Sequence, residues 1–188
     1  IELPYVQTSA KATSIFVDQG VVYICGYEND GSIDTPVYWK EGIKTILTYT
    51  GTQGQATSIF VCENNVYISS RIADSGYLAR YWINEQEQTL ELTTGSSFAQ
   101  SIFVADDNVY ISGKEGNVAK LWVNGALRAN LTVGTNISDA FDIFAYNGDV
   151  YVCGYESNGS YNVAKVWKNG SLYQTLTGGT KNAVAYSI

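Results

Sequence analysis

A four-residue motif that recurs along the chain constrains the fold more than any other feature. Ser-Ile-Phe-Val occurs at 14–17, 58–61 and 101–104, and Asp-Ile-Phe-Ala occupies the corresponding positions 142–145. The copies are 41 to 44 residues apart, and Val-Tyr-Ile or Val-Tyr-Val follows each at a fixed distance. Self-similarity at a period of about 40–45 residues indicates a repeat protein in which each unit is one supersecondary module.

One tryptophan occupies the same position in every unit, and each unit then ends in Leu-Thr or a close variant followed by glycine. We expect the indoles to be buried packing anchors. A row of sugar-stacking sites, one aromatic per unit, is the alternative. The four residues are Trp39, Trp82, Trp122 and Trp167.

Each unit predicts four short antiparallel strands, because its apolar segments are rich in β-branched and aromatic residues. Two-residue turns separate the first strand from the second and the third from the fourth. Their residues tolerate the positive φ that tight hairpins require. The turns are Gln19-Gly20, Glu63-Asn64, Asp106-Asp107 and Asn147-Gly148, then Glu41-Gly42, Asn84-Glu85, Asn124-Gly125 and Asn169-Gly170.

Four antiparallel strands in such a period match one blade of a β-propeller. The continuous apolar runs at 15–17 and 22–24 predict strands that are buried on both faces, as in a blade between two others. The sequence therefore predicts an all-β fold: a β-propeller with four complete four-stranded antiparallel blades plus partial terminal strands. Residues 1–188 form one propeller domain or a segment of a propeller.

The two ends of the chain extend this repeat. Residues 3–5 align with 47–49, inside a fourth strand, and residues 185–188 match the start of a first strand. The four units can close a small ring with accessory terminal strands. Alternatively, they are part of a longer propeller or assemble with a second chain. An open ring would expose apolar blade faces and sheet edges, which favours a homo-oligomer.

Composition excludes several functional classes. The net charge is −7 and no basic run is present, which argues against nucleic-acid binding. The chain has no histidine, which removes histidine triads and histidine metal sites, and no apolar stretch approaches the roughly 18 residues of a membrane span. The three cysteines are widely spaced, so we expect no metal, no cofactor and no disulfide scaffold, with Cys25 and Cys153 as buried free thiols.

Three segments carry a resemblance to a known kind of protein. The strings at 149–156, 163–170 and 176–180 resemble repeats of uncharacterised, exported bacterial proteins with propeller-like repeats. The resemblance covers nearly the whole chain. It implies an extracellular, periplasmic or cell-surface location, but it carries no activity, so no catalytic residue is transferred from it. The Gly-His and Trp-Asp pairs of WD40 repeats and the sialidase Asp-box are missing from the sequence.

The predicted binding face carries the loops between second and third strands and the linkers between units, because connection length varies on this face and not on the face of the tight turns. Tyrosine there offers a rigid stacking surface with a polar tip, suited to sugars or peptides. The candidate ligand-binding residues are Tyr27, Glu28, Asp30, Arg71, Tyr77, Lys114, Glu115, Tyr155, Glu156 and Tyr161.

Three of these candidates, Glu28, Glu115 and Glu156, share one repeat position, where the second unit has Ile72. A partial ring of carboxylates suits a cation or acid–base chemistry, and solvated loop ends are the simpler interpretation. The leading hypothesis is a non-catalytic binding module that recognises a glycan or protein. A carboxylate-based glycoside hydrolase or lyase and a structural spacer domain of a larger surface protein are the alternatives.

Overall fold

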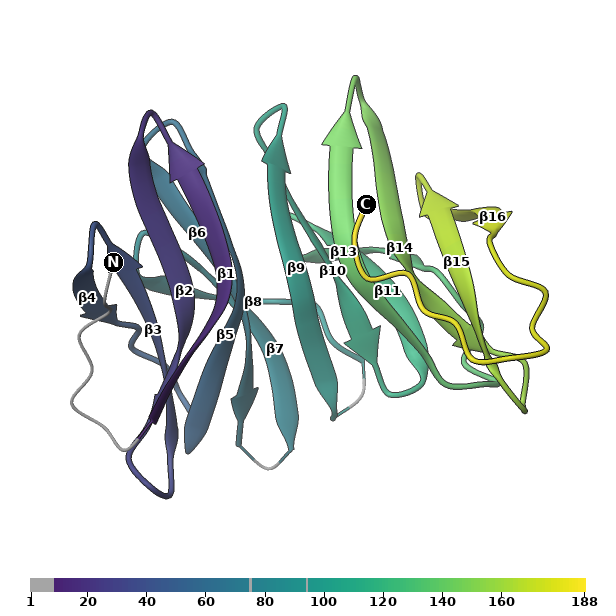
Figure 1. The fold of residues 1–188 in the computed structure, drawn as a ribbon, viewed down its shortest axis with the longest axis horizontal. Coiled ribbons are helices and arrows are strands. Elements are labelled where there is room, and N and C mark those ends of the chain that lie inside the picture. The colour runs from purple at the N-terminus through teal and green to yellow at the C-terminus, as the bar shows by residue number, and fades with distance from the viewer. Residues whose placement is uncertain (1–8, 75, 94) are drawn as a thin grey trace. The chain divides into compact units, whose positions relative to one another are not determined.

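The computed structural model describes residues 9–74, 76–93 and 95–188, and in these ranges every regular element is a β-strand (Figure 1). The strands form four four-stranded antiparallel sheets, each with its strands in chain order. The predicted all-β fold class is confirmed, and we call each sheet a blade. The predicted partial strand at residues 3–5 lies outside the described residues.

The blades are numbered along the chain. Blade 1 comprises β1 (Ser9–Asp18), β2 (Val21–Asn29), β3 (Asp34–Lys40) and β4 (Ile43–Ile46). Blade 2 comprises β5 (Gln53–Cys62), β6 (Asn65–Ala73), β7 (Tyr77–Ile83) and β8 (Gln86–Thr89). Blade 3 comprises β9 (Ser97–Ala105), β10 (Asn108–Glu115), β11 (Val118–Val123) and β12 (Ala126–Asn130). Blade 4 comprises β13 (Ser138–Tyr146), β14 (Asp149–Ser157), β15 (Asn162–Lys168) and β16 (Ser171–Thr175).

The chain divides into two compact units, Ile1–Thr89 with blades 1 and 2, and Leu90–Ile188 with blades 3 and 4. In each unit the tryptophan-bearing face of the second blade packs on the first blade. Trp82 thus lies in one apolar cluster with Tyr23 and Cys25 of blade 1. Trp167 lies in one cluster with Leu121 and Leu131 of blade 3.

All four tryptophans are structural, as predicted, because each indole is at most 1% exposed. The Trp82 indole N–H donates to the Thr48 carbonyl at 2.9 Å, and that of Trp122 donates to the Glu91 carbonyl at 2.9 Å. These bonds satisfy the polar atom that burial removes from water. All four indoles are therefore buried and are not available to stack on a sugar.

The predicted tight turns are all present. Their sixteen residues have φ between 48° and 85°. In three blades the asparagine of the second turn also binds the second strand. Its side-chain oxygen accepts the backbone N–H of a valine, at 2.9 Å for Asn84 and Val66 and at 2.8 Å for Asn124 and Val109. One asparagine thus closes the hairpin and fastens it to the neighbouring strand.

The first strand of each blade begins several residues before the motif seen in the sequence, and a β-bulge precedes the motif. The bulge leaves Thr13, Thr57, Gln100 and Phe141 without a partner in the ladder. A bulge bends its strand and re-aims the extra side chain. Thr13 uses this freedom to bind the next blade, donating to the Ala56 carbonyl at 2.8 Å.

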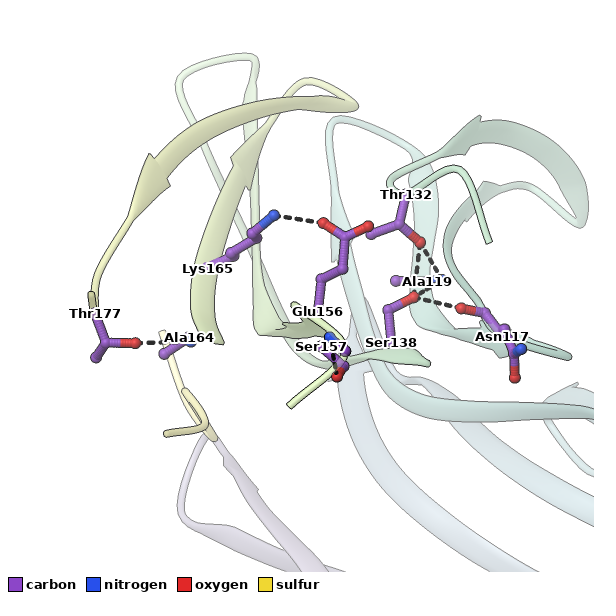
Figure 2. A network of polar contacts seen from close by, with 10 residues as sticks. Asn117, Ala119, Thr132, Ser138, Glu156, Ser157, Ala164, Lys165 and Thr177 are labelled. Carbon is purple, nitrogen blue, oxygen red and sulfur yellow. Dashed lines mark hydrogen bonds and ion pairs between the residues drawn. The ribbon is translucent and has the colours of Figure 1, made fainter. Parts of the chain in front are cut away.

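A polar network explains the Leu-Thr motif that ends each unit (Figure 2). In blade 3 the Thr132 hydroxyl accepts the Ala119 N–H at 3.1 Å, and the Ser138 hydroxyl accepts the same N–H at 2.8 Å. In blade 4 Thr177 accepts the Ala164 N–H at 3.2 Å. The threonine therefore extends the pairing of the third strand past the end of the short fourth strand.

Residues Ala185–Ile188 occupy the place that a first strand of a following blade would take beside β13. The Ile188 N–H donates to the Asp142 carboxylate at 3.1 Å, which repeats the bond from the Ile59 N–H to the Ser14 hydroxyl at 3.4 Å. The predicted terminal strand is nevertheless not regular. A first strand pairs in its ladder only with the second strand of its own blade, and no described strand has that role here.

Among the described residues, no helix is long and apolar enough to cross a membrane.

Candidate functional site

The predicted binding residues cluster at the end of each blade where second and third strands are joined, which we call the variable-loop face. One repeat position of this face, in the second strand, holds Tyr27, Arg71, Lys114 and Tyr155. The next position holds Glu28, Ile72, Glu115 and Glu156. Because successive side chains of a strand point to opposite sides of the sheet, the two positions have different surroundings.

The three glutamates are ion-paired within their own units. The Glu28 carboxylate, 2% exposed, accepts bonds from the Lys44 ammonium at 2.9 and 3.1 Å. Glu156 of β14 pairs with Lys165 of β15 (Figure 2).

Glu115 is equally buried and pairs with Lys120, which is 3% exposed. The Glu115 carboxylate also accepts the Thr93 N–H at 2.5 Å and the Thr93 hydroxyl at 3.0 Å. The structure therefore uses these carboxylates to hold strands and linkers in place.

In unit 1, Arg71 and Tyr77 come together as part of a polar cluster. The Arg71 guanidinium lies 5.8 Å from the Tyr77 ring centroid, and its Nε donates to the Gln55 side chain at 2.9 Å. The Gln55 amide in turn donates to Asp34, whose other oxygen accepts the Asn29 amide at 2.7 Å. A small cavity of about 20 Å³ lies between these groups, and Tyr77 is 41% exposed. The space suffices for roughly one water molecule.

In unit 2 the corresponding cluster is built on a buried carboxylate. Asp139, 4% exposed, accepts bonds from the Gln100 amide at 3.1 Å and from the Ala140 N–H at 3.0 Å, and the Lys114 ammonium lies 3.8 Å away. Desolvation raises the pKa of Asp139, and Lys114 and the hydrogen bonds oppose that rise.

The Lys114 ammonium also lies 5.2 Å from the Phe98 ring centroid. Tyr155 stacks on Phe141 at a centroid distance of 5.9 Å. Burial is the main cause that raises the pKa of Tyr155, and the charge of Asp139 raises it further. The cluster thus joins one cation, one carboxylate and several aromatic rings.

The remaining candidates lie apart from these clusters. Asp30 shapes its own loop, since its carboxylate accepts the N–H groups of Ser32 at 2.9 Å and Ile33 at 2.8 Å. These bonds lower the pKa of Asp30. Tyr161 is 41% exposed at the tip of the equivalent loop of blade 4, and Tyr27 is half-buried in β2. Within the described part of the chain, no group of three or more potential ligands could hold a metal ion.

Sequence reasoning missed the partners that define these clusters. Asp34, Gln55 and Asp139 were not among the predicted residues. Gln55 and Asp139 come from first strands, outside the variable loops, and Asp34 begins the third strand of blade 1. The lysines did leave a signal, since Lys120 and Lys165 both stand two residues before a tryptophan. Cys25 and Cys153 are buried free thiols, as predicted. Burial raises the pKa of Cys25 to about 12 and that of Cys153 to about 11.

No protein-family model matches the chain, and no curated protein matches it in sequence.

Proposed function

We propose that the protein is a non-catalytic binding module that recognises a glycan through its variable-loop face. The observation that carries this proposal is the pairing of Arg71 with Tyr77 in unit 1. The half-exposed Tyr77 ring offers a flat surface for a sugar ring. The Arg71 guanidinium beside it, with the neighbouring carboxylate and amide, offers donors and acceptors for the hydroxyl groups of the sugar. Such a platform also suits a peptide, so a protein ligand is the competing outcome.

The glycan proposal is tested with a glycan array followed by calorimetric titration of the best binder. Tyr77→Ala is expected to weaken binding about tenfold or more, because an aromatic anchor is lost. Tyr146→Ala is the matched control. Tyr146 is 64% exposed, but it belongs to blade 4 and stands beside a tight turn, at the end of that blade away from the variable-loop face. An equal loss in both variants, or a response to proteins alone, would remove the glycan proposal.

The ion pairs favour binding over hydrolysis. A retaining or inverting glycosidase needs two carboxyl groups that flank one bond, one of them able to donate a proton. Glu28, Glu115 and Glu156 are each held by a lysine ammonium. We therefore expect bound oligosaccharides to be recovered intact, and turnover that Glu156→Gln abolishes would support the hydrolase alternative instead.

We also propose that the module acts outside the cytoplasm, as the resemblance to exported bacterial repeats implies. Cell fractionation of the source organism with an antibody against the chain tests this location. Recovery in the cytoplasmic fraction would contradict it.

One blade face supports a proposal of self-association. Ile15 and Val17 of β1 are 63% and 55% exposed. The equivalent residues of the other blades, Ile59 and Val61 among them, are 3–8% exposed. In unit 1 that equivalent face of blade 2 is covered by blade 1. We propose that a second copy of the chain covers the face of blade 1. This face carries the same isoleucine and valine as the face of blade 2 that packs on blade 1.

Native mass spectrometry across a concentration series tests this association. Ile15→Lys is expected to shift the equilibrium to the monomer, whereas Ile43→Lys should not, because Ile43 is 74% exposed on the edge strand β4. A wild-type chain that stays monomeric at its highest soluble concentration would contradict the proposal.

A further inference from the structure

A cavity of about 370 Å³ lies in unit 2 between blades 3 and 4. It opens at the end of the blades that carries the tight turns, because Gly148 and Asn169 of blade 4 belong to those turns and line it. Its volume lies in the range of about 300–1,000 Å³ that small-molecule sites occupy. No residue of the variable-loop face lines this cavity, so it is separate from the glycan site proposed above.

The cavity exists because two side chains that fill the same place in unit 1 are replaced in unit 2. In unit 1 the Tyr38 hydroxyl donates to the Glu85 carboxylate at 2.9 Å, and this bridge joins blades 1 and 2. The equivalent residues in unit 2 are Leu121 and Gly170. Leucine is shorter than tyrosine, and glycine has no side chain to meet it. The space that the bridge occupies in unit 1 therefore remains open in unit 2.

Gly170 cannot regain a side chain without rearrangement. A Cβ atom at this position would lie 2.8 Å from the Ala129 Cβ, and its φ is +85°. A residue with a side chain is therefore disfavoured at position 170, and this part of the cavity stays unfilled.

The lining combines an apolar wall with a cation. Leu121, Val123 and Val150 supply the wall, and Tyr110 and Arg128 supply polar groups. Among the described residues, no hydrogen bond or ion pair engages the Arg128 guanidinium or the Tyr110 hydroxyl. The asparagine at the rim is already used, because Asn169 accepts the Val150 N–H and donates to Asp149.

We infer that this cavity binds a small monocarboxylate with an apolar body. The planar guanidinium of arginine matches a carboxylate through two parallel hydrogen bonds, and the Tyr110 hydroxyl offers a further donor. The apolar wall takes the body of the ligand. A general attraction of anions does not explain such binding, because the chain carries a net charge of −7. Binding therefore depends on Arg128 itself.

Benzoate is the probe for this site, and benzyl alcohol is its neutral counterpart. Ligand-observed NMR titration of the full chain is expected to show benzoate binding and at least tenfold weaker binding of benzyl alcohol. Arg128→Gln should weaken benzoate about tenfold to a hundredfold, the usual range for losing a charge-assisted contact. Lys181→Gln is the matched control, because it removes the same charge from an exposed residue of unit 2 that does not line the cavity.

A second variant tests the cavity without changing a charge. Leu121→Tyr places in blade 3 the residue that fills this position in blade 1, and it should abolish benzoate binding. Circular dichroism and a melting curve report whether Leu121→Tyr folds. If that variant does not fold, Arg128→Gln, at an exposed position, still tests benzoate binding.

Three results would overturn the inference. They are the failure of benzoate to bind, equal binding of benzyl alcohol, and an unchanged affinity in Arg128→Gln. Tyr77→Ala should leave benzoate binding intact, so this site and the glycan site can fail independently.

Discussion

The pair Ile15 and Ile59 offers one substitution at one repeat position in two opposite environments. Both residues belong to the Ser-Ile-Phe-Val motif of a first strand in unit 1, and both pair in the ladder with an isoleucine of the second strand. Ile59 is 3% exposed and belongs to the core cluster with Trp82, whereas Ile15 is 63% exposed. The chemistry removed by Ile→Ala is identical, so any difference in stability reports the surroundings.

The expected magnitudes differ several-fold. Ile59→Ala removes three buried carbon atoms and leaves a cavity, which costs about 2–5 kcal/mol of unfolding free energy. Ile15→Ala removes atoms that are already mostly in water, so its cost should stay within about 0.5 kcal/mol. Urea unfolding followed by tryptophan fluorescence measures both, at a protein concentration where the chain is monomeric.

Equal losses in the two variants would refute the reasoning. A loss near 3 kcal/mol for Ile15→Ala in the monomer would mean that the Ile15 side chain is covered within the chain. A loss that appears only at high protein concentration would instead support the proposed self-association through this face.

Three further predictions concern buried ionisable groups. Glu115→Gln should cost about 3–5 kcal/mol in urea unfolding, because it leaves the buried Lys120 ammonium without its counter-ion, and the double variant with Lys120→Met should recover much of that loss. The Cys25 thiol should not react with a disulfide reagent at pH 8 until the chain unfolds, since burial raises its pKa to about 12; labelling of Cys25 itself in the folded chain, as distinct from the partly exposed Cys62, would contradict this. Burial raises the pKa of Asp139, so its ionisation opposes folding, and stability should fall as pH rises from about 4 towards neutrality but not in Asp139→Asn. Asp149 shows the opposite dependence, because Lys168 lowers its pKa, so the stability that the ionised carboxylate contributes is lost as pH falls. Asp149→Asn should remove this loss at low pH.

The repeat predicted much of the fold because its signals are local. The turn at Asn124-Gly125 could be predicted from two residues that tolerate positive φ, and the burial of Trp122 from its fixed place in a period. The bulge at Gln100 could not be predicted in the same way, because it depends on how the first strand meets both its own second strand and the neighbouring blade.

The candidate site was predicted less completely, because its groups meet through tertiary contacts. Arg71 and Tyr77 were both named from loop position, but Gln55 and Asp34, which hold Arg71 in place, come from strands of two different blades. Glu28 and Glu115 were named for their shared repeat position. Their burial against lysines is a property of the packed strands that a loop-based argument does not include.

The glutamate pairs also limit how the blades can be recombined. In blades 3 and 4 the lysine that holds the glutamate comes from the third strand, at 120 and 165, whereas in blade 1 it comes from the fourth strand, at 44. A chimera that grafts the third strand of blade 3 into blade 1 would bring two ammonium groups to one carboxylate, and the reciprocal graft would leave a buried anion with none. Shuffling experiments should therefore exchange the last two strands of a blade together.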